Sequence, residues 1–408
     1  MIISAQSWHK PGVVDRSESV RMKNLLLRLF LVSALILPWL SAPAAAERPT
    51  FATSARNAVV IDFQTGAVLL DKNADQRIPT ASMSKIMTAY TVYTYLRDGK
   101  AKLDDLLPVS ERAWRTGLND NESRMFVPLN GRVKVEDLLR GMIVQSGNDA
   151  CVVLAEGLAG SEPAFVEKMN ELAQKMGLTN SHFANVHGLP APDHYSSPRD
   201  LAMLSRHLIQ DFPQYYRYES EKEFAFNGIK QGNRNPLLYK DLGADGIKTG
   251  HTEEAGYGLV GSAVRSGRRV IFVLSGMQSL KERGQESERV LDWAYREFAD
   301  YAIAKAAEPI DEAPVWMGVA DKVPVAPQSD AVVTLWPAAR KGLKVSAVYD
   351  GTAKAPLAKG QVVGKLVITA PESDAVEVPL VATQEVDRLG PFGRMAEAAG
   401  YLLLGKKR

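Results

Sequence analysis

Segments with strand character stand at both ends of a long helical region, and this order restricts the folds open to the chain. Residues 58–62 and 67–71 are rich in Val, Ile and Leu and flank a Thr-Gly turn, which predicts a hairpin. Helical periodicity follows to about residue 210, and strand character returns between residues 223 and 277. Early and late strands that enclose helices favour one sheet covered by those helices. The sequence therefore predicts an α/β sheet whose N-terminal and C-terminal strands are neighbours.

The chain changes character after this region. Residues 280–304 predict one long helix that closes the first domain, which we expect to span residues 47–307. Short Val-rich segments follow, separated by Pro, Gly, Asp or Lys, and they predict a small all-β domain over residues 308–388. A length of 408 residues with 46% hydrophobic content is enough for two packed cores.

Residues 389–408 predict an amphipathic helix. Phe392, Met395 and Leu402 fall near one helical face, and three basic residues end the chain. An apolar face with basic residues at its end suits a helix that lies in a membrane surface, so we expect a membrane anchor. A helix docked on the all-β domain and a frayed tail remain alternatives.

Residues 1–46 have the parts of an export signal peptide. Basic residues precede the apolar run "LFLVSALILPWL", and the small residues Ala44 and Ala46 precede an expected cut before Glu47. The run is short for a membrane-spanning helix, although an uncleaved anchor remains an alternative. Met22 begins a more typical signal and is an alternative start. We therefore expect an exported protein.

Charge and cysteine content exclude several classes of function. The formal net charge is +2, of which the first 46 residues supply +3 through five basic and two acidic residues, so the remainder carries about −1. A nearly neutral chain gives no argument for a nucleic-acid partner. The single cysteine, Cys151, excludes an intrachain disulfide framework, and we expect it in the core. Six scattered His residues give no zinc spacing, so neither a metal nor a cofactor is expected.

The segment "TASMSKIMTAY" places Ser82 and Lys85 three residues apart at a predicted helix start. Residues at this spacing meet on one face of a helix, so the lysine could take a proton from the serine. The spacing alone decides nothing, because Ser7 and Lys10 share it in a part of the chain outside any expected domain. An ordinary helix cap beside a surface cation has the same pattern.

Two later motifs give the pattern chemical meaning. "QSGND" places Ser146 and Asn148 at a break between helices, and "GIKTGHT" places Lys248, Thr249 and Gly250 on a predicted strand. Ser-x-x-Lys at a helix start, Ser-x-Asn in a helical loop and Lys-Thr-Gly on a strand are together the signatures of serine enzymes that react with penicillin. Each motif also lies in the structural context that this chemistry needs.

The residue types fit a serine nucleophile that is activated by a lysine. A hydroxyl needs a neighbouring base, and a free lysine, with a pKa of about 10.4, must be desolvated or placed near another cation to act as one. Lys248 is that candidate cation for Lys85. We expect Ser146 to relay the proton to the leaving group and Asn148 to hold Lys85 and the substrate amide.

The same motifs predict how a substrate is held. The backbone N–H groups of Ser82 and His251 are candidates for an oxyanion hole. Gly250 would let a peptide lie close to its strand and pair with it as an added strand.

The chain resembles a known family at these motifs. "ASMSK", "SGNDA", "DGIKTGHTEEAGYGLV" and "EKEFAFNGIKQGNRNPLLY" are similar to the low-molecular-mass penicillin-binding proteins, the serine-type D-alanyl-D-alanine carboxypeptidases. The resemblance implies the penicillin-recognising serine-enzyme fold, an antiparallel sheet flanked by helices, followed by a small all-β domain. It implies removal of the terminal D-alanine from the peptidoglycan stem pentapeptide through an acyl-enzyme on Ser82. β-Lactam antibiotics would be covalent inhibitors, and the enzyme would act at the periplasmic face of the inner membrane.

The resemblance also assigns site residues. It implies a catalytic role for Ser82, Lys85 and Ser146. It places Arg234, in "NRN", near the substrate carboxylate, with a structural ion pair as the alternative. The other implied substrate-binding residues are Asn148, Lys248, Thr249, Gly250 and His251.

Three other functions remain open. A DD-endopeptidase would cut peptidoglycan crosslinks with the same site. A β-lactamase of one class needs a Glu with an Asn four residues on, whereas Glu167 and Asn170 are three apart. A non-catalytic wall-binding scaffold would not need the intact motifs. His187, in "HGL", is expected to be structural because lysines already fill the role of the base.

Overall fold

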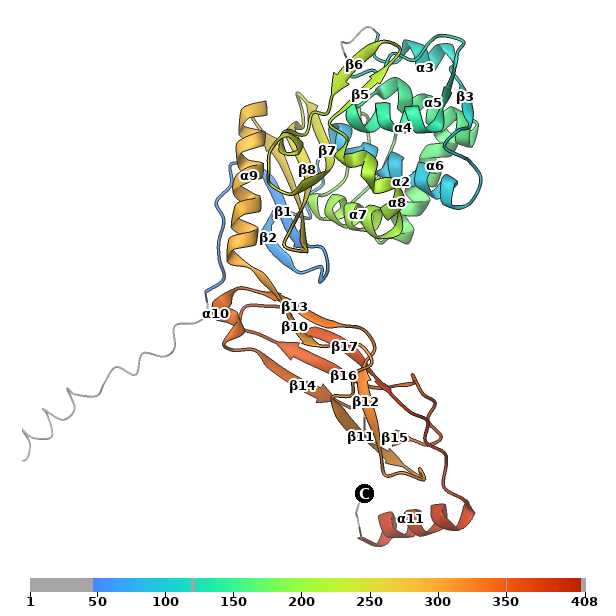
Figure 1. The fold of residues 1–408 in the computed structure, drawn as a ribbon, viewed down its shortest axis with the longest axis vertical. Helices are drawn as coiled ribbons and strands as arrows, with labels where there is room; N and C mark the ends of the chain where they lie inside the picture. Colours follow the sequence, from blue (N-terminus) through green and yellow to red (C-terminus); the bar gives the residue numbers. More distant parts are fainter. Residues whose placement is uncertain (1–46, 119–121, 350, 405–408) are drawn as a thin grey trace, which may run out of the picture. The chain divides into compact units, whose positions relative to one another are not determined.

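The structure, a computed structural model, describes residues 47–118, 122–349 and 351–404 (Figure 1). The predicted signal peptide lies outside the described residues, as do the three basic residues that end the chain. Contacts join the chain from Arg48 onward into one compact unit.

A five-stranded antiparallel sheet forms the centre of the first domain. Its strand order is β2-β1-β9-β8-β7, so the first strand pairs with the last, for example Val59 with Val273. The predicted neighbourhood of N-terminal and C-terminal strands is therefore confirmed. β7 lies at one edge, with β8 as its only sheet neighbour. The strands are β1 (Asn57–Asp62), β2 (Val68–Lys72), β7 (Ala244–Thr252), β8 (Gly256–Arg265) and β9 (Arg268–Met277).

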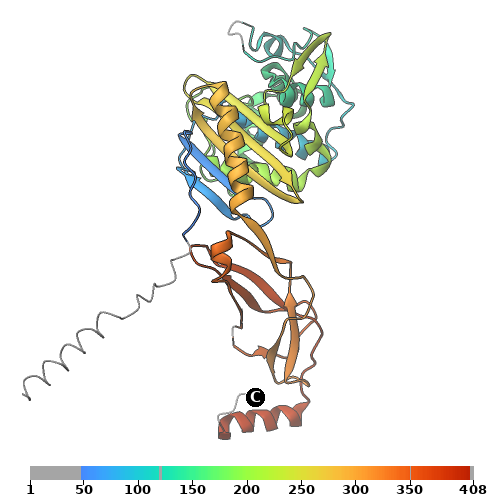
Figure 2. The same cartoon turned by 60° about the vertical axis from the view of Figure 1, so that its left-hand side comes forward.

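Helices cover both faces of this sheet, which explains why every residue of β1 is buried. α9 (Leu280–Glu297) packs on β8 and β9 from one side, while α7 contacts β1 and β9 from the other (Figure 2). Serine caps begin several of these helices; Ser197 Oγ, for example, accepts a hydrogen bond from the N–H of Asp200. The helices on the α7 side are α2 (Lys85–Arg97), α4 (Val135–Val144), α5 (Asn148–Ala159), α6 (Glu162–Lys175) and α7 (Pro198–Asp211).

Short elements connect these helices and strands. They are β3 (Leu106–Pro108), α3 (Glu111–Arg115), β4 (Arg132–Lys134), α8 (Pro213–Tyr216), η2 (Arg217–Ser220), β5 (Glu223–Phe226), β6 (Ile229–Gly232) and η3 (Pro236–Tyr239).

The predicted helix over residues 280–304 is too long. α9 ends at Glu297, and residues Ala299–Ala304 form β10, which pairs antiparallel with β13 (Ala331–Leu335). Phe298, at the junction, packs its ring edge against the buried ring of Trp336. Hydrogen bonding to a distant strand and aromatic burial therefore override the local helical pattern.

The second domain is all-β, as predicted. A six-stranded sheet has the order β14-β16-β17-β12-β11-β15, and the β10–β13 pair lies beside the first domain. Thr334 Oγ1 is 2.6 Å from Thr65 Oγ1 of that domain and donates to Asp300 at 2.8 Å. The remaining elements are β11 (Asp311–Trp316), β12 (Lys322–Pro327), α10 (Pro337–Arg340), β14 (Lys344–Val348), β15 (Ala353–Lys354), β16 (Val362–Thr369) and β17 (Val376–Ala382).

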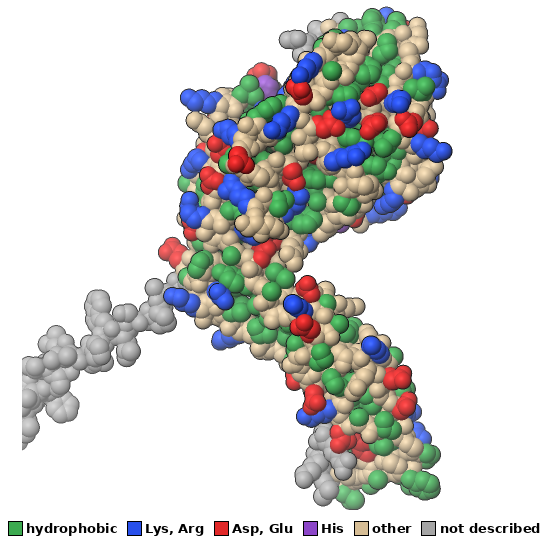
Figure 3. All heavy atoms as spheres, in the orientation of Figure 1, with side chains coloured by type: hydrophobic (Ala, Val, Ile, Leu, Met, Phe, Trp, Pro, Cys, Tyr) green, Lys and Arg blue, Asp and Glu red, His purple; other side chains and the backbone are tan. Residues whose placement is uncertain are grey.

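The C-terminal segment forms the helix α11 (Pro391–Leu404). Its large apolar side chains are unusually exposed: Phe392 is 88% and Leu403 83% accessible. Figure 3 shows hydrophobic side chains on the surface at this end of the chain. In the part of the chain that the structure describes, no helix combines the length and the hydropathy needed to cross a membrane.

Candidate active site

Ser82 lies in the short 3₁₀ helix η1 (Ala81–Ser84), which leads directly into α2. Ala81, just before it, has a left-handed φ of +47°, a conformation that stores backbone strain. Gly188, with φ of +85°, approaches the carbonyl of Ala81 so closely that a Cβ at this glycine would lie 1.9 Å from the oxygen. The loop that carries Gly188 therefore packs directly against the turn that carries the serine.

Lys85 is buried and directed at this serine. Its Nζ is 2.7 Å from Ser82 Oγ, 2.7 Å from Asn148 Oδ1 and 2.6 Å from the carbonyl oxygen of His187. Burial lowers the pKa of Lys85 to about 8, and the positive charge of Arg234 acts in the same direction. A usable fraction of Lys85 is therefore neutral near pH 8 and can accept a proton.

The second lysine lies across from Ser146. Ser146 adopts φ of +63° between α4 and α5, and its Oγ accepts a hydrogen bond from Lys248 Nζ at 3.1 Å. Burial lowers the pKa of Lys248 well below its usual range, and the charge of Lys85 lowers it further. The charge of Lys85 therefore disfavours protonation of Lys248. The pKa of Lys85 is lowered by burial and by Arg234, so an effect of Lys248 on Lys85 stays a prediction.

Asn148 and Arg234 are held by side chains of Glu122 and Ser123, which precede β4 in the chain. Asn148 Nδ2 donates to Glu122 Oε2 at 2.8 Å, and Arg234 Nη1 donates to Ser123 Oγ at 2.5 Å. The carboxylate of Asp149 accepts three backbone N–H groups of the same segment at 2.9 to 3.2 Å. Sequence reasoning missed the roles of Glu122 and Asp149, although Asp149 follows the Ser-x-Asn motif directly.

These side chains line one cleft, of about 720 Å³, beside the edge strand β7. Gly250 allows β7 to lie close to η1. Any Cβ at this position would lie 2.8 Å from the carbonyl oxygen of Thr80. The ring of His251 stacks on that of Tyr257 with centroids 3.9 Å apart. The lysines lie buried beneath. Residues lining the cleft include Ser82, Ser146, Asn148, Arg234, Thr249, Gly250 and His251.

Arg283 also lines this cleft, and no sequence motif marked it. It projects from α9, and its Nη2 donates to the carbonyl oxygen of Arg234 at 3.0 Å. Burial lowers its pKa to about 10, and the charge of Arg234 contributes. Its only signal in the sequence is an arginine in a helix, which is common on surfaces.

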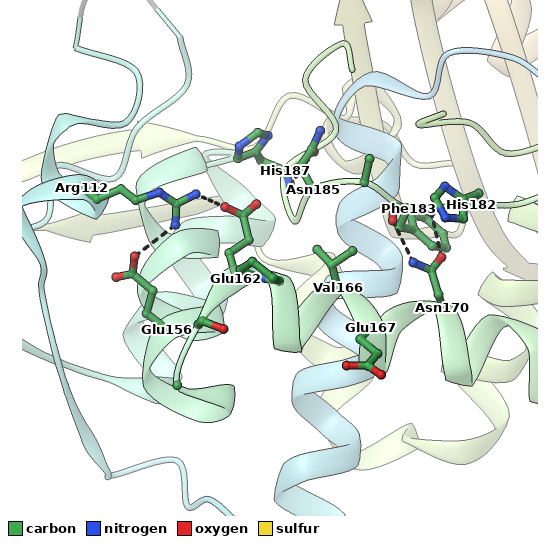
Figure 4. A pocket seen from close by; sticks show the side chains of 14 residues that line it. Arg112, Glu156, Glu162, Val166, Glu167, Asn170, His182, Phe183, Asn185 and His187 are labelled. Atoms are coloured by element: carbon green, nitrogen blue, oxygen red, sulfur yellow. Dashed lines mark hydrogen bonds and ion pairs between the residues drawn. The ribbon is translucent and has the colours of Figure 1, made fainter. Parts of the chain in front are cut away.

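A larger hollow, of about 1030 Å³, is lined by residues of α6 and by His187 (Figure 4). Three of its charged side chains pair, because Arg112 contacts both Glu156 and Glu162. None of the three motifs lines it. Burial lowers the pKa of the His187 imidazole to about 3, so the ring is neutral, while its backbone carbonyl supports Lys85.

Cys151 is fully buried, which confirms its predicted place in the core. Its Sγ donates to the carbonyl oxygen of Gly147 at 3.3 Å, and burial raises the pKa of the thiol to about 12. Among the described residues, no group of three or more His, Cys, Asp or Glu side chains is arranged to hold a metal ion.

Comparisons with known proteins agree with this geometry. Residues 42–279 match the family model of D-alanyl-D-alanine carboxypeptidases, and residues 298–388 match that of the penicillin-binding protein 5 C-terminal domain. The carboxypeptidase DacA of Haemophilus influenzae is 42% identical over 347 residues, which cover 84% of this chain and 88% of that protein. DacA of Escherichia coli K12 is 39% identical over 386 residues, covering 92% and 96%.

A solved structure extends the similarity to the whole fold. Penicillin-binding protein 5 from Haemophilus influenzae superimposes with a TM-score of 0.79 at 40% identity, covering 83% of this chain and 99% of that one. The chain therefore belongs to the D-alanyl-D-alanine carboxypeptidase family, and it is a serine-type, penicillin-binding carboxypeptidase of peptidoglycan.

Proposed function

We propose that the enzyme removes the terminal D-alanine of the stem pentapeptide through an acyl-enzyme on Ser82. The observation that carries this assignment is the 2.7 Å contact between Ser82 Oγ and a buried lysine whose pKa lies near 8. Ser82 Oγ attacks the carbonyl carbon of the penultimate D-alanine while neutral Lys85 takes its proton. Water then hydrolyses the ester and frees the serine.

Ser146 and Lys248 serve the leaving group. When the C–N bond breaks, the departing amine of D-alanine must gain a proton. Ser146 Oγ can pass one on because Lys248 Nζ donates to it at 3.1 Å. The backbone N–H groups of Ser82 and His251 stabilise the negative oxygen of the tetrahedral intermediate.

Arg234 and Arg283 receive the terminal carboxylate. Both guanidinium groups line the cleft. Arg283 is buried and Arg234 is exposed at the cleft wall, and partial loss of solvent lowers the pKa of both. Two like charges that share a poorly solvated site gain from an anion placed between them. Thr249 lines the same cleft and offers a hydroxyl to that carboxylate.

Arg234→Gln is expected to lower kcat/KM for diacetyl-Lys-D-Ala-D-Ala by about 10- to 100-fold, since a hydrogen bond to a charged group contributes roughly 1.5–3 kcal/mol. The same peptide with an amidated C-terminus has no terminal carboxylate. Arg234→Gln should therefore change kcat/KM for the amidated peptide little. D-alanine or D-alaninamide release measures both. Lys230→Gln, which removes an exposed cation paired with Glu223, is the control and should leave both rates unchanged. Equal losses on both peptides would assign Arg234 a structural role.

Membrane attachment by α11 belongs to the same proposal. Peptidoglycan lies outside the cytoplasmic membrane, so we propose that residues 1–46 direct export and that α11 lies in the periplasmic face of that membrane. The exposed apolar face of α11, with Phe392, Met395, Leu402 and Leu403, supports this. Fourteen residues suit a helix in the surface plane.

Phe392→Glu combined with Leu403→Glu is expected to weaken binding to vesicles of phosphatidylethanolamine and phosphatidylglycerol by about 100-fold or more. Each buried side chain contributes roughly 1.5–3 kcal/mol, and the carboxylates add a desolvation cost. Co-sedimentation of the full chain measures binding, and peptide hydrolysis reports folding. Glu397→Gln is the control: it removes a negative charge from the same helix and should bind at least as tightly as the native chain. Undiminished binding by the double variant would remove α11 from the membrane contact.

A further inference from the structure

Glu122 and Glu253 are the acidic side chains among the described residues that line the cleft. Glu122 lines the site together with Arg234 and Arg283, above the two buried lysines. The catalytic steps derived above do not use it. Its carboxylate nevertheless makes a direct contact with the machinery through Asn148.

Two hydrogen bonds connect the Glu122 carboxylate, through Asn148, to the proposed base Lys85. Lys85 Nζ donates to Asn148 Oδ1 at 2.7 Å, and Asn148 Nδ2 donates to Glu122 Oε2 at 2.8 Å. A side-chain amide has an accepting end and a donating end, and a carboxylate can only accept. Glu122 therefore selects the orientation in which the amide oxygen faces Lys85.

This selection matters most after Lys85 has lost its proton. Protonated Lys85 is a donor only, so it would itself enforce the orientation of Asn148. Neutral Lys85 has a lone pair and could accept from an N–H of Asn148 if the amide turned round. That lone pair is the one that must take the proton of Ser82. A carboxylate that holds the amide in place keeps the base free for catalysis.

The residues that follow Glu122 are hydrogen-bonded to the start of α5. The N–H of Asn148, the first residue of α5, donates to the carbonyl oxygen of Ser123 at 2.8 Å. Asp149 holds the following residues through three backbone N–H groups. The positive end of α5 also favours a carboxylate here.

We propose that Glu122 is a positioning residue of this active site: its carboxylate keeps the Asn148 amide turned with Oδ1 toward Lys85 and leaves the second N–H of that amide for the substrate. The inference rests on the proposed roles of Ser82 and Lys85.

Glu122 also acts on Lys85 through its charge. The negative charges of Glu122 and Asp149 raise the pKa of Lys85, whereas burial and Arg234 lower it. The other titratable groups that interact with Lys85 are Cys151, Lys248, His187 and His194. Removing the charge of Glu122 therefore lowers the pKa of Lys85, and the acidic limb of the acylation profile must move to lower pH.

The experiment compares Glu122→Gln and Glu122→Ala in the full chain. The rate of covalent labelling by a fluorescent penicillin is measured between about pH 6 and pH 10, with D-alanine release in parallel. Gln keeps an acceptor for Asn148 without the charge, so Glu122→Gln should stay within about threefold of the native maximal rate, with its acidic limb at lower pH. Glu122→Ala removes the acceptor as well and should lower the maximal rate about tenfold or more. Glu254→Gln, an exposed neighbour outside the cleft, should match the native chain.

The outcomes separate three readings. Native rates and an unmoved profile in both variants overturn the inference while leaving the proposed function intact. Equal slowing of both variants with an unmoved acidic limb reduces Glu122 to a structural support of its loop and also overturns it. A native chain that penicillin does not label overturns the proposed function, and this inference with it.

Discussion

Ser82→Ala is expected to lower D-alanine release by about 10⁴-fold or more and to abolish covalent labelling by penicillin. Alanine offers no atom that can form the ester, so both reactions lose their first step. Removing the nucleophile of other serine hydrolases leaves only the rate supplied by binding and the oxyanion hole. Mass spectrometry of the mature chain with and without penicillin measures the adduct, and a D-alanine assay measures turnover.

Ser84→Ala provides the matched control for this experiment. Ser84 lies two residues further on, and its Oγ is 2.7 Å from His194 Nε2. This contact resembles the pair of a nucleophilic serine and its histidine base. Ser84 is completely buried, so no substrate reaches it. We expect the Ser84→Ala chain to keep the penicillin adduct. Labelling that survives in Ser82→Ala and disappears in Ser84→Ala would reverse the assignment of the nucleophile.

The sheet was predictable because its signals are local. Hydrophobic strands flank the helices in the sequence, and one sheet must accommodate them, so the pairing of β1 with β9 follows from their order. The end of α9 was not predictable in the same way. Residues Ala299–Ala304 have no strand pattern that excludes a helix, and their conformation depends on β13, about thirty residues later. Pairing between distant segments leaves little trace in local periodicity.

Some residues of the active site were predictable from local motifs, and others were not. Ser82, Lys85, Ser146 and Lys248 stand in short motifs, because the chemistry requires particular side chains at particular spacings. The third acceptor of Lys85 is a backbone carbonyl, that of His187, and a carbonyl is present at every residue. Glu122 and Arg283 stand in segments without a motif. They line the cleft because the fold brings these segments next to the motifs. The family comparisons support carboxypeptidase activity over the endopeptidase, β-lactamase and scaffold alternatives.

Lys85→Arg is expected to lower the acylation rate by about 10³-fold or more, although it keeps a positive charge in place. A guanidinium group stays protonated at every accessible pH, so it can donate to Ser82 but cannot take its proton. General-base catalysis contributes about 10²- to 10⁴-fold, and the larger part is expected here because Lys85 is hydrogen-bonded directly to Ser82 Oγ. The rate of penicillin labelling measures the loss, and a thermal melt reports folding.

The pH dependence of the acylation rate shows whether Lys85 acts as a base or only as a positive charge. The pKa of Lys85 is lowered to about 8, and the active form is the neutral one. The native acylation rate should therefore rise about tenfold per pH unit below pH 7 and level off above about pH 8. Lys85→Arg should lose this rise. Lys248→Arg keeps a cation beside Ser146 and should lose less rate, about tenfold, while retaining the rise. A Lys85→Arg enzyme with the native profile would show that another group deprotonates Ser82; loss of the rise only in Lys248→Arg would exchange the roles of the two lysines.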